Sequence, residues 1–314
     1  MTGSHPAVSR PLAAIGLKVA SIAVFVGMQA FIKLAGIVPA GQIVFFRSFF
    51  AMVPILILLA WTGEIRTAFY TQRPGRHIVR GIVGVSSMAL GFFALTRLPL
   101  PEAIVLNYAQ PLLVVVISAL VLGETVRIFR WTAVAVGFVG VLIISWPKLT
   151  LLGSPEGIGS DEALGVLAAL AAAAISAVAL LQVRSLVATD RSSTIVIWFS
   201  LTASAAGLLS MPFGWAPLTG WQIFVLVMSG ICGGIAQIMM TEAYRYASVA
   251  TVAPFEYSSI LFGLVVGYLL FADVPTVYTL VGGAIVVASG LFIVWREQRL
   301  GLERAKTPKV SPPQ

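Results

Sequence analysis

The sequence predicts an all-α integral membrane protein with ten transmembrane helices, arranged as two inverted five-helix repeats. Hydrophobic residues make up 59% of the 314 residues, whereas charged residues make up only 10%. Apolar runs recur from one end of the chain to the other, and short phrases of the first half return in the second. Because soluble proteins of this length coat an apolar core with far more charge, the solvent of this fold is expected to be lipid.

Ten apolar runs approach the length that a membrane helix needs, which is about 20 residues. Amides inside lipid must be paired within the chain, so the runs form helices or a closed barrel. Strict polar–apolar alternation is missing, which favours helices. The first run is as long as its neighbours and lacks a small-residue cleavage site, so a cleaved signal peptide is not expected. The runs lie at residues 12–32, 39–61, 78–97, 101–122, 131–147, 163–184, 194–212, 221–244, 249–271 and 275–295.

The formal net charge of +8 is distributed unevenly across this predicted membrane topology. Alternating the ten spans places 15 of the 20 lysines and arginines on the side that holds both termini, and only three on the other. This bias predicts a multi-pass protein of the inner (plasma) membrane with cytoplasmic N and C termini. The lipid bilayer is therefore the expected partner of the basic residues, and no nucleic acid is expected.

The two halves of the chain resemble each other at an offset of about 149 residues. Asn107-Tyr108 falls opposite Glu256-Tyr257, and Gly123-Glu124 falls opposite Ala272-Asp273. Because five is an odd number of spans, the halves have opposite orientations, and a site is expected at their interface near the midplane. The predicted divisions are a cytoplasmic N-tail at 1–11, a first repeat at 12–147, an external linker at 148–162, a second repeat at 163–295 and a basic cytoplasmic C-tail at 296–314.

Arg47 is an ionisable residue deep in the second predicted span, among four phenylalanines at positions 45, 46, 49 and 50. Charged groups inside a membrane are costly and usually face a cavity or a partner. One interpretation is an anchor for an anionic or carbonyl-bearing substrate, because a guanidinium group offers a fork of donors. The alternative is a clamp between helices, on backbone carbonyls or a glutamate.

Glu256 is the matching feature of the ninth span. Pro254 precedes it, removes a helix amide and opens nearby carbonyls, while Tyr257 and Ser259 follow it. Burial raises the proton affinity of a carboxyl group, so Glu256 suits proton coupling or contact with a cationic substrate. The alternative is a static ion pair with Arg47 or Arg245.

Further polar residues extend these two candidates. Asn107 and Gln110 share one face of the fourth span beside Tyr108, and they are substrate ligands or hydrogen-bonded contacts between helices. Glu242 and Arg245 are three residues apart, a spacing that fits a coupling pair or a local ion pair.

Other classes of protein fit the sequence less well. The only histidines are His5 and His77, so no span carries a metal cluster or a Ser/His pair, which argues against a membrane-embedded enzyme. We expect no metal and no other cofactor. A channel would more often show a filter ring around a shared pore. Gly263 and Gly267 are spaced for close helix packing, within the chain or in a homodimer.

Several phrases resemble the drug/metabolite transporter superfamily, in the branch with two EamA-type repeats. They are Phe46-Arg47-Ser48, the stretch from Phe93 to Glu124, and the stretch from Ala243 to Ser259. The resemblance covers residues 12–295. Asp273 stands where the family usually has glutamate, a mild departure.

The resemblance implies a secondary transporter that moves a small organic metabolite or drug by alternating access around a central cavity. Relatives export amino acids or drugs, or take up S-adenosylmethionine or riboflavin. The sequence from Pro254 to Ser259 is closest to that of the S-adenosylmethionine and riboflavin transporters, so such a cargo is favoured. An amino-acid or drug exporter of the same fold is the alternative. Proton coupling is a further hypothesis that rests on Glu256.

Overall fold

A computed structural model describes residues 11–121, 123, 127–149, 161–187, 189–247 and 249–306, which form helices and turns without a strand. The predicted N-tail up to Arg10, the turn residue Glu124, most of the linker and the tail after Lys306 lie outside the described residues. The helices are α1 (Pro11–Leu34), α2 (Ala40–Trp61), α3 (Ile65–Ala68), α4 (Pro74–Leu95), α5 (Leu100–Asn107), α6 (Ala109–Val121), α7 (Ile128–Leu149), α8 (Asp161–Val187), α9 (Ser192–Leu209), η3 (Met211–Phe213), α10 (Gly220–Tyr246), α11 (Val249–Val252), η4 (Ala253–Tyr257), α12 (Ser258–Phe271) and α13 (Val277–Lys306).

Membrane-length helices confirm the predicted fold class. In the part of the chain that the structure describes, nine helical segments are long and apolar enough to cross a bilayer. A shorter apolar segment, Ser193–Leu209 in α9, corresponds to the seventh predicted run. All ten predicted runs therefore fall on helical segments of the structure, and the chain is an all-α membrane protein.

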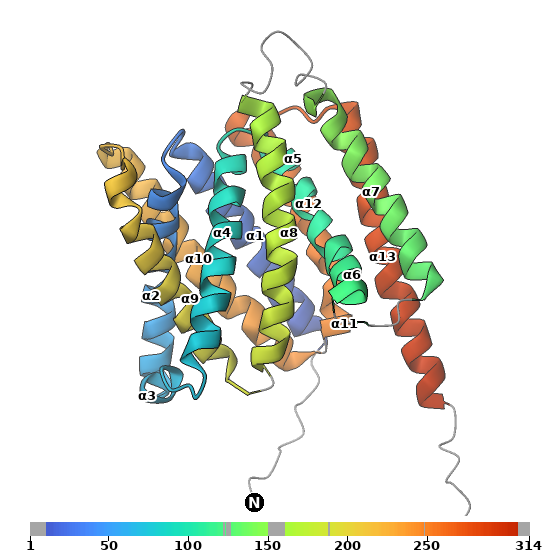
Figure 1. Cartoon of the computed structure of the whole chain (residues 1–314), viewed down its shortest axis with the longest axis horizontal. Helices are drawn as coiled ribbons and strands as arrows, with labels where there is room; N and C mark the ends of the chain where they lie inside the picture. The colour runs from blue at the N-terminus through green and yellow to red at the C-terminus, as the bar shows by residue number, and fades with distance from the viewer. Residues whose placement is uncertain are drawn as a thin grey trace, which may run out of the picture.

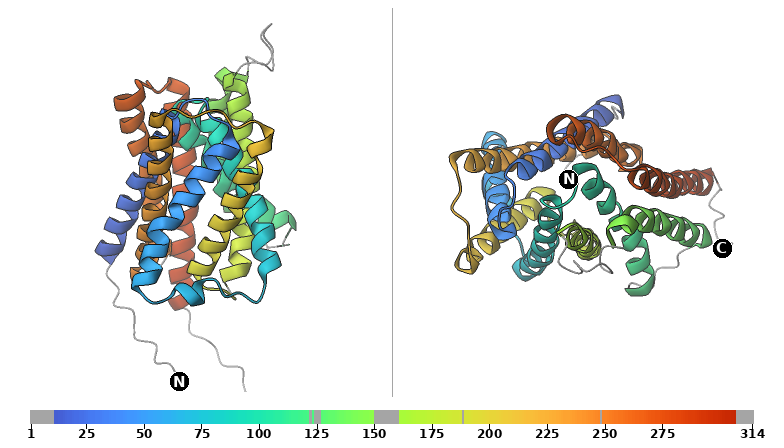
Figure 2. Two further views of the ribbon diagram at one scale, coloured as in Figure 1. Left: turned by 90° about the vertical axis from the view of Figure 1, so that its left-hand side faces the viewer. Right: turned by 90° about the horizontal axis from the view of Figure 1, so that it is seen from above.

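Helix packing follows a two-fold pattern between the halves. The helix α1 packs along α10, and its counterpart in the second half, α8, packs along α4. The pairs α2 with α9 and α7 with α13 join equivalent helices of the two halves. Figure 1 shows the start of α1 and the end of α13 at the same end of the bundle, which we call the terminal end, and Figure 2 shows α7 and α13 paired at one edge. Five spans per half give the halves opposite directions through the bundle.

Two predicted spans are broken helices rather than continuous ones. The fourth divides at Tyr108 into α5 and α6, and the ninth divides into α11, η4 and α12. Pro111 follows Asn107 by four residues, and Pro254 begins the second break. A proline ring clashes with the carbonyl four residues earlier and lacks an amide hydrogen. Both breaks therefore have the same cause and occupy equivalent places in the two halves.

A second equivalence appears at the turns that follow the broken helices. Gly123 has a φ of 64°, and Ala272, 149 residues later, has a φ of 53°. This left-handed conformation is accessible to glycine but strained for alanine. The second half therefore keeps the backbone of a glycine turn with a residue that disfavours it.

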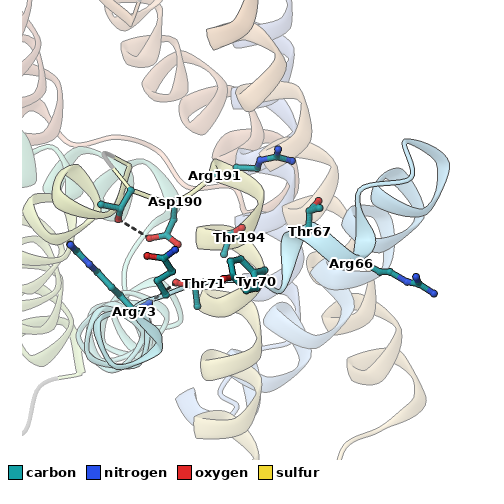
Figure 3. Close-up of a pocket in the computed structure, with 10 residues that line it drawn as sticks. Arg66, Thr67, Tyr70, Thr71, Arg73, Asp190, Arg191 and Thr194 are labelled. Carbon is teal, nitrogen blue, oxygen red and sulfur yellow. Dashed lines mark hydrogen bonds between the residues drawn. The ribbon is translucent and has the colours of Figure 1, made fainter. Parts of the chain in front are cut away.

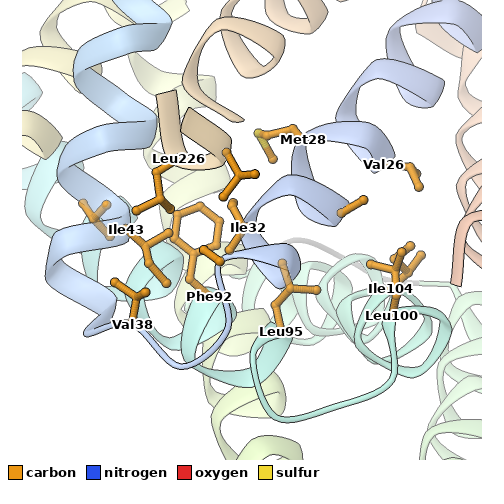
Figure 4. Packing of buried hydrophobic residues seen from close by; sticks show 14 of the residues in the cluster. Val26, Met28, Ile32, Val38, Ile43, Phe92, Leu95, Leu100, Ile104 and Leu226 are labelled. Carbon is orange, nitrogen blue, oxygen red and sulfur yellow. The ribbon is translucent and has the colours of Figure 1, made fainter. Parts of the chain in front are cut away.

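One of the apolar core clusters lies where α1, α2 and α10 meet α4 and α5 (Figure 4). Ile32, Ile43 and Leu226 are fully buried there, beside Phe92. The helix α12 approaches this core closely because Gly263 faces Ile104. Gly267 similarly faces Pro101, so both predicted small-residue positions serve packing within the chain. Their alternative role in a homodimer stays a prediction.

Candidate functional site

The two helix breaks meet through Tyr108 and Tyr257. The rings of Tyr108 and Tyr257 stack with their centroids 4.9 Å apart and their planes inclined by 24°. The Tyr108 hydroxyl donates a hydrogen bond of 2.6 Å to the Glu256 carbonyl, and its oxygen lies 2.6 Å from Ser259 Oγ. A hydroxyl has one proton, so Ser259 is the donor to Tyr108. Four predicted site residues are thus brought together by the breaks.

Glu256 pairs with Lys18, a residue of the first span that was not among the predicted site residues. Lys18 Nζ lies 3.2 Å from Glu256 Oε1 and donates a 3.1 Å hydrogen bond to the Tyr244 hydroxyl. The Lys18 side chain is buried, whereas that of Glu256 is 52% exposed. The static partner expected for Glu256 is therefore neither Arg47 nor Arg245. The charge of Lys18 inside an apolar run was the available signal.

Arg47 occupies a different place, in a cavity of about 110 Å³ between α2, α4, α9 and α10. Arg80, Phe199 and Gln237 line the same cavity. Within the described residues, Arg47 Nε has no hydrogen-bond partner. The predicted clamp on backbone carbonyls or a glutamate is therefore not seen there. Arg80 was missed because it was counted among the basic residues of the membrane edge.

Asn107 is exposed on a third surface, a cavity of about 170 Å³ between α1, α4, α5 and α8. Gln29 and Ser87 also line this cavity. The predicted partner Gln110 is partly buried and is not among the described residues that line it. The structure therefore separates Asn107 from Gln110, although both lie close to Tyr108 in the chain.

Glu242 and Arg245 form a local ion pair of 2.7 Å near the end of α10. The Arg245 side chain is 71% exposed. This geometry matches one of the two predicted alternatives, and a role in coupling stays a prediction. Glu242 also lines a small cavity of about 80 Å³ that includes Thr241 and Gln237.

A wider cavity of about 510 Å³ lies at the terminal end, between the loop after α3 and the start of α9 (Figure 3). Asp190 accepts a 2.8 Å hydrogen bond from Thr189 and lies 3.6 Å from His77 Nε2. Burial opposes ionisation of Asp190, but hydrogen bonds from Thr71 and Thr189 and the charge of His77 outweigh it. The pKa of this carboxyl group is therefore lower than its ordinary value. Figure 3 shows Arg66 and Arg191 directed away from Asp190.

At the opposite end, charged side chains tie the two halves together. Lys33 lies 3.1 Å from Asp273 and donates a 2.7 Å hydrogen bond to the Leu98 carbonyl, while Asp273 accepts from the Leu100 amide. Both side chains are about 15% exposed. A second group joins Lys148 to Glu102 at 3.3 Å, and Thr279 donates to Glu102. We call these two groups the opposite-end clusters.

Comparison with known proteins gives relatives along most of the chain. A riboflavin transporter of Rhizobium johnstonii is 30% identical over 83% of this chain and 83% of its own length. A pseudopaline exporter of Pseudomonas aeruginosa is 30% identical over 83% of this chain and 89% of its own length. An S-adenosylmethionine uptake transporter of Rickettsia felis is 23% identical over 82% and 84%.

A solved crystal structure shares the fold at 20% sequence identity, with a TM-score of 0.64 over 91% of this chain and 97% of that chain. The EamA-like transporter family matches the chain twice, at residues 12–146 and 163–295. The two matched segments contain the two broken helices whose tyrosines stack. The chain therefore belongs to the EamA-like transporter family, within the drug/metabolite transporter superfamily.

Proposed function

We propose that this protein is a secondary transporter that moves a small organic metabolite across the inner membrane by alternating access. The observation that carries the proposal is the meeting of two broken helices at Tyr108 and Tyr257. Broken helices at a repeat interface are how many transporters place backbone carbonyls and polar side chains at the membrane midplane. The names of the riboflavin and S-adenosylmethionine transporters favour a cargo of that kind. Because another relative is named a pseudopaline exporter, export is the alternative direction of transport.

The distribution of contacts supports a state closed at the opposite end and accessible from the terminal end. The opposite-end clusters seal the junction of the two halves with largely buried ion pairs. Glu256, by contrast, lies within a span and yet is half exposed. The positive-inside bias supports a cytoplasmic terminal end. We infer that the structure is the inward-facing state, and that opening outward requires the Lys33–Asp273 contact to separate.

The central residues suggest separate roles in cargo binding. The stacked tyrosines offer an aromatic surface to a planar ring. Lys18 and Glu256 form an ion pair. A cationic cargo or a proton can break this pair by competing with Lys18 for the carboxylate. Proton coupling at Glu256 is therefore part of the proposal. Asn107 and Arg47 line neighbouring cavities and are assigned contacts with more distant parts of the cargo.

Flux into proteoliposomes tests this proposal. Purified protein is reconstituted, and uptake of radiolabelled riboflavin, S-adenosylmethionine and a set of amino acids is measured against protein-free vesicles. We expect saturable flux of at least one cargo, reduced at least tenfold by Tyr108→Ala or Glu256→Ala and little changed by Glu64→Gln, a change at an exposed residue before α3. An imposed pH gradient should drive the cargo uphill.

Two results would count against different parts of the proposal. If wild-type protein of correct fold carried none of the cargoes saturably, transport of this class would be rejected. If it carried one, and both central variants carried it equally well, the site assignment would be rejected while transport stood.

A further inference from the structure

Two arginines inside the membrane region share one small cavity in which no described residue supplies a counter-ion. Arg47 comes from α2 and Arg80 from α4, and both line the cavity of about 110 Å³. Arg47 Nε, Arg80 Nε and Arg80 Nη1 are buried and have no hydrogen-bond partner within the described ranges. The other polar side chains of this lining are those of Ser200 and Gln237. None of the described lining residues is a carboxylate.

This arrangement is unfavourable unless something negative enters the cavity. An ion removed from water loses its favourable hydration unless a partner replaces it, and two like charges in one cavity repel each other. The face of Phe199 compensates part of this cost, because Arg80 Cζ lies 4.1 Å from the ring centroid. A single cation–π contact offsets part of the lost hydration of one guanidinium group and does nothing for the other.

A glycine lies beside each of the two guanidinium groups. An added Cβ at Gly233 would lie 3.5 Å from Arg47 Nε, and one at Gly84 would lie 3.4 Å from Arg80 Nη1. Small residues therefore stand beside both guanidinium groups, on α10 and on α4. No side chain at Gly84 or Gly233 therefore covers either guanidinium group.

The cavity lies between two others. It shares Ile55, Val196 and Gln237 with the small cavity that reaches Glu242 near the end of α10. On α4, Ser87 and Gly91 follow Arg80 by seven and eleven residues and line the cavity of Asn107. These spacings place the three residues on one helix face. The arginines thus stand between the terminal end and the cavity of Asn107.

We propose that Arg47 and Arg80 form an anion site that binds an oxyanion group, a carboxylate or a phosphate, of the transported molecule. Planar guanidinium groups match both oxyanions through paired hydrogen bonds. Sites for whole organic ligands usually measure roughly 300–1,000 Å³, so this cavity holds one substituent of the cargo. The inference rests on the proposed function for the source of the anion, whereas the binding of the anion itself can be measured without transport.

Anion-dependent thermal stability of the purified full-length protein tests the site. The probes are sodium acetate and sodium phosphate, titrated at constant ionic strength. A ligand that binds only the folded protein raises its melting temperature. We expect both probes to stabilise the wild type, with an apparent affinity at least tenfold weaker in Arg80→Gln and Arg47→Gln. Arg97→Gln is the matched control, because Arg97 already pairs with Asp161 at 3.2 Å outside this cavity.

Gln237→Glu provides a test that does not depend on removing an arginine. The new carboxylate would stand in the same cavity and act as an internal counter-ion. We expect a higher melting temperature without probe and loss of the response to acetate and phosphate. Equal responses in the wild type, the arginine variants and Gln237→Glu would overturn the anion site and leave the flux result untouched.

The source of the anion is decided by flux of any cargo found in proteoliposomes. If the cargo supplies the group, acetate and phosphate compete with it and raise its KM, and Arg80→Gln raises KM more than it lowers the maximal rate. If cargo flux instead requires free phosphate or acetate, a separate inorganic anion occupies the site, and the assignment to the cargo is overturned.

Discussion

Tyr108 and Tyr257 stack at 4.9 Å although 149 residues separate them in the chain. They occupy equivalent positions of the two repeats, each beside a proline-induced helix break. A pseudo-two-fold axis brings equivalent positions together only where they lie near that axis. The stacked pair therefore marks the junction of the halves, around which alternating access is proposed to occur.

The Tyr108 hydroxyl is expected to stabilise this junction. Tyr108→Phe keeps the ring and removes the contacts with the Glu256 carbonyl and Ser259. A buried hydrogen bond contributes about 1 kcal/mol, and an unpaired partner costs more. We expect a loss of about 1–2 kcal/mol, measured by thermal unfolding in detergent. Tyr278→Phe, an exposed position of α13, should change little; equal losses in both variants would contradict the assignment.

Gly290 is expected to tolerate no side chain. A Cβ there would overlap the Tyr257 hydroxyl, and the ring would have to leave its stack with Tyr108. Gly290→Ala should lower the melting temperature and reduce flux, with partial recovery in Gly290→Ala/Tyr257→Phe. Gly27→Ala is the control, since nothing lies within 4 Å of a Cβ at Gly27. A neutral Gly290→Ala would show that the Tyr257 position is not fixed.

Lys18 and Glu256 should behave as a coupled pair. Glu256→Gln leaves the buried Lys18 ammonium without its counter-ion, at a cost of about 1–3 kcal/mol, because the half-exposed carboxylate gives less than a fully buried one. Lys18→Met/Glu256→Gln should recover much of that loss. The four melting temperatures form a double-mutant cycle. Additive effects would mean that the two residues are not coupled, as expected for the exposed pair Glu242 and Arg245.

Ala272 stands in a left-handed turn with a φ of 53°. Such a conformation costs a non-glycine residue about 1–2 kcal/mol, part of which is offset because glycine loses more entropy on folding. Ala272→Gly should therefore raise stability by up to about 1 kcal/mol, seen as a higher melting temperature. Ala205→Gly, on an exposed face of α9, should instead lower it. A loss in both variants would contradict the strain.

Asp190 should make stability depend on pH. Its pKa is lower in the folded protein than its ordinary value, so its contribution is present above about pH 3.9. That contribution is lost as the pH falls through the folded pKa, because the unfolded chain then binds the proton first. The difference in melting temperature between wild type and Asp190→Asn should shrink as the pH falls below about 4. Glu64→Gln serves as control, and a constant difference would refute the pH effect.

Much of the candidate site follows from residue type and repeat position. The sequence predicts Tyr108, Glu256, Tyr257 and Ser259 as site residues because Asn107-Tyr108 recurs as Glu256-Tyr257 at an offset of 149 residues, and the structure brings these four residues together. Lys18 and Arg80 were not assigned to a site. Lys18 pairs with Glu256 and Arg80 stacks on Phe199, each more than 100 residues away, and no local pattern reports such contacts.

The sequence by itself determined the membrane fold, the ten spans and the equivalence of the halves, because lipid imposes length and apolar composition on each span separately. Only the tertiary structure decided which charged side chains lie next to one another. Lys18 pairs with Glu256, whereas Arg47 shares a cavity with Arg80. The faces of packed helices set these pairings, and a linear pattern does not specify how each face turns toward its neighbours.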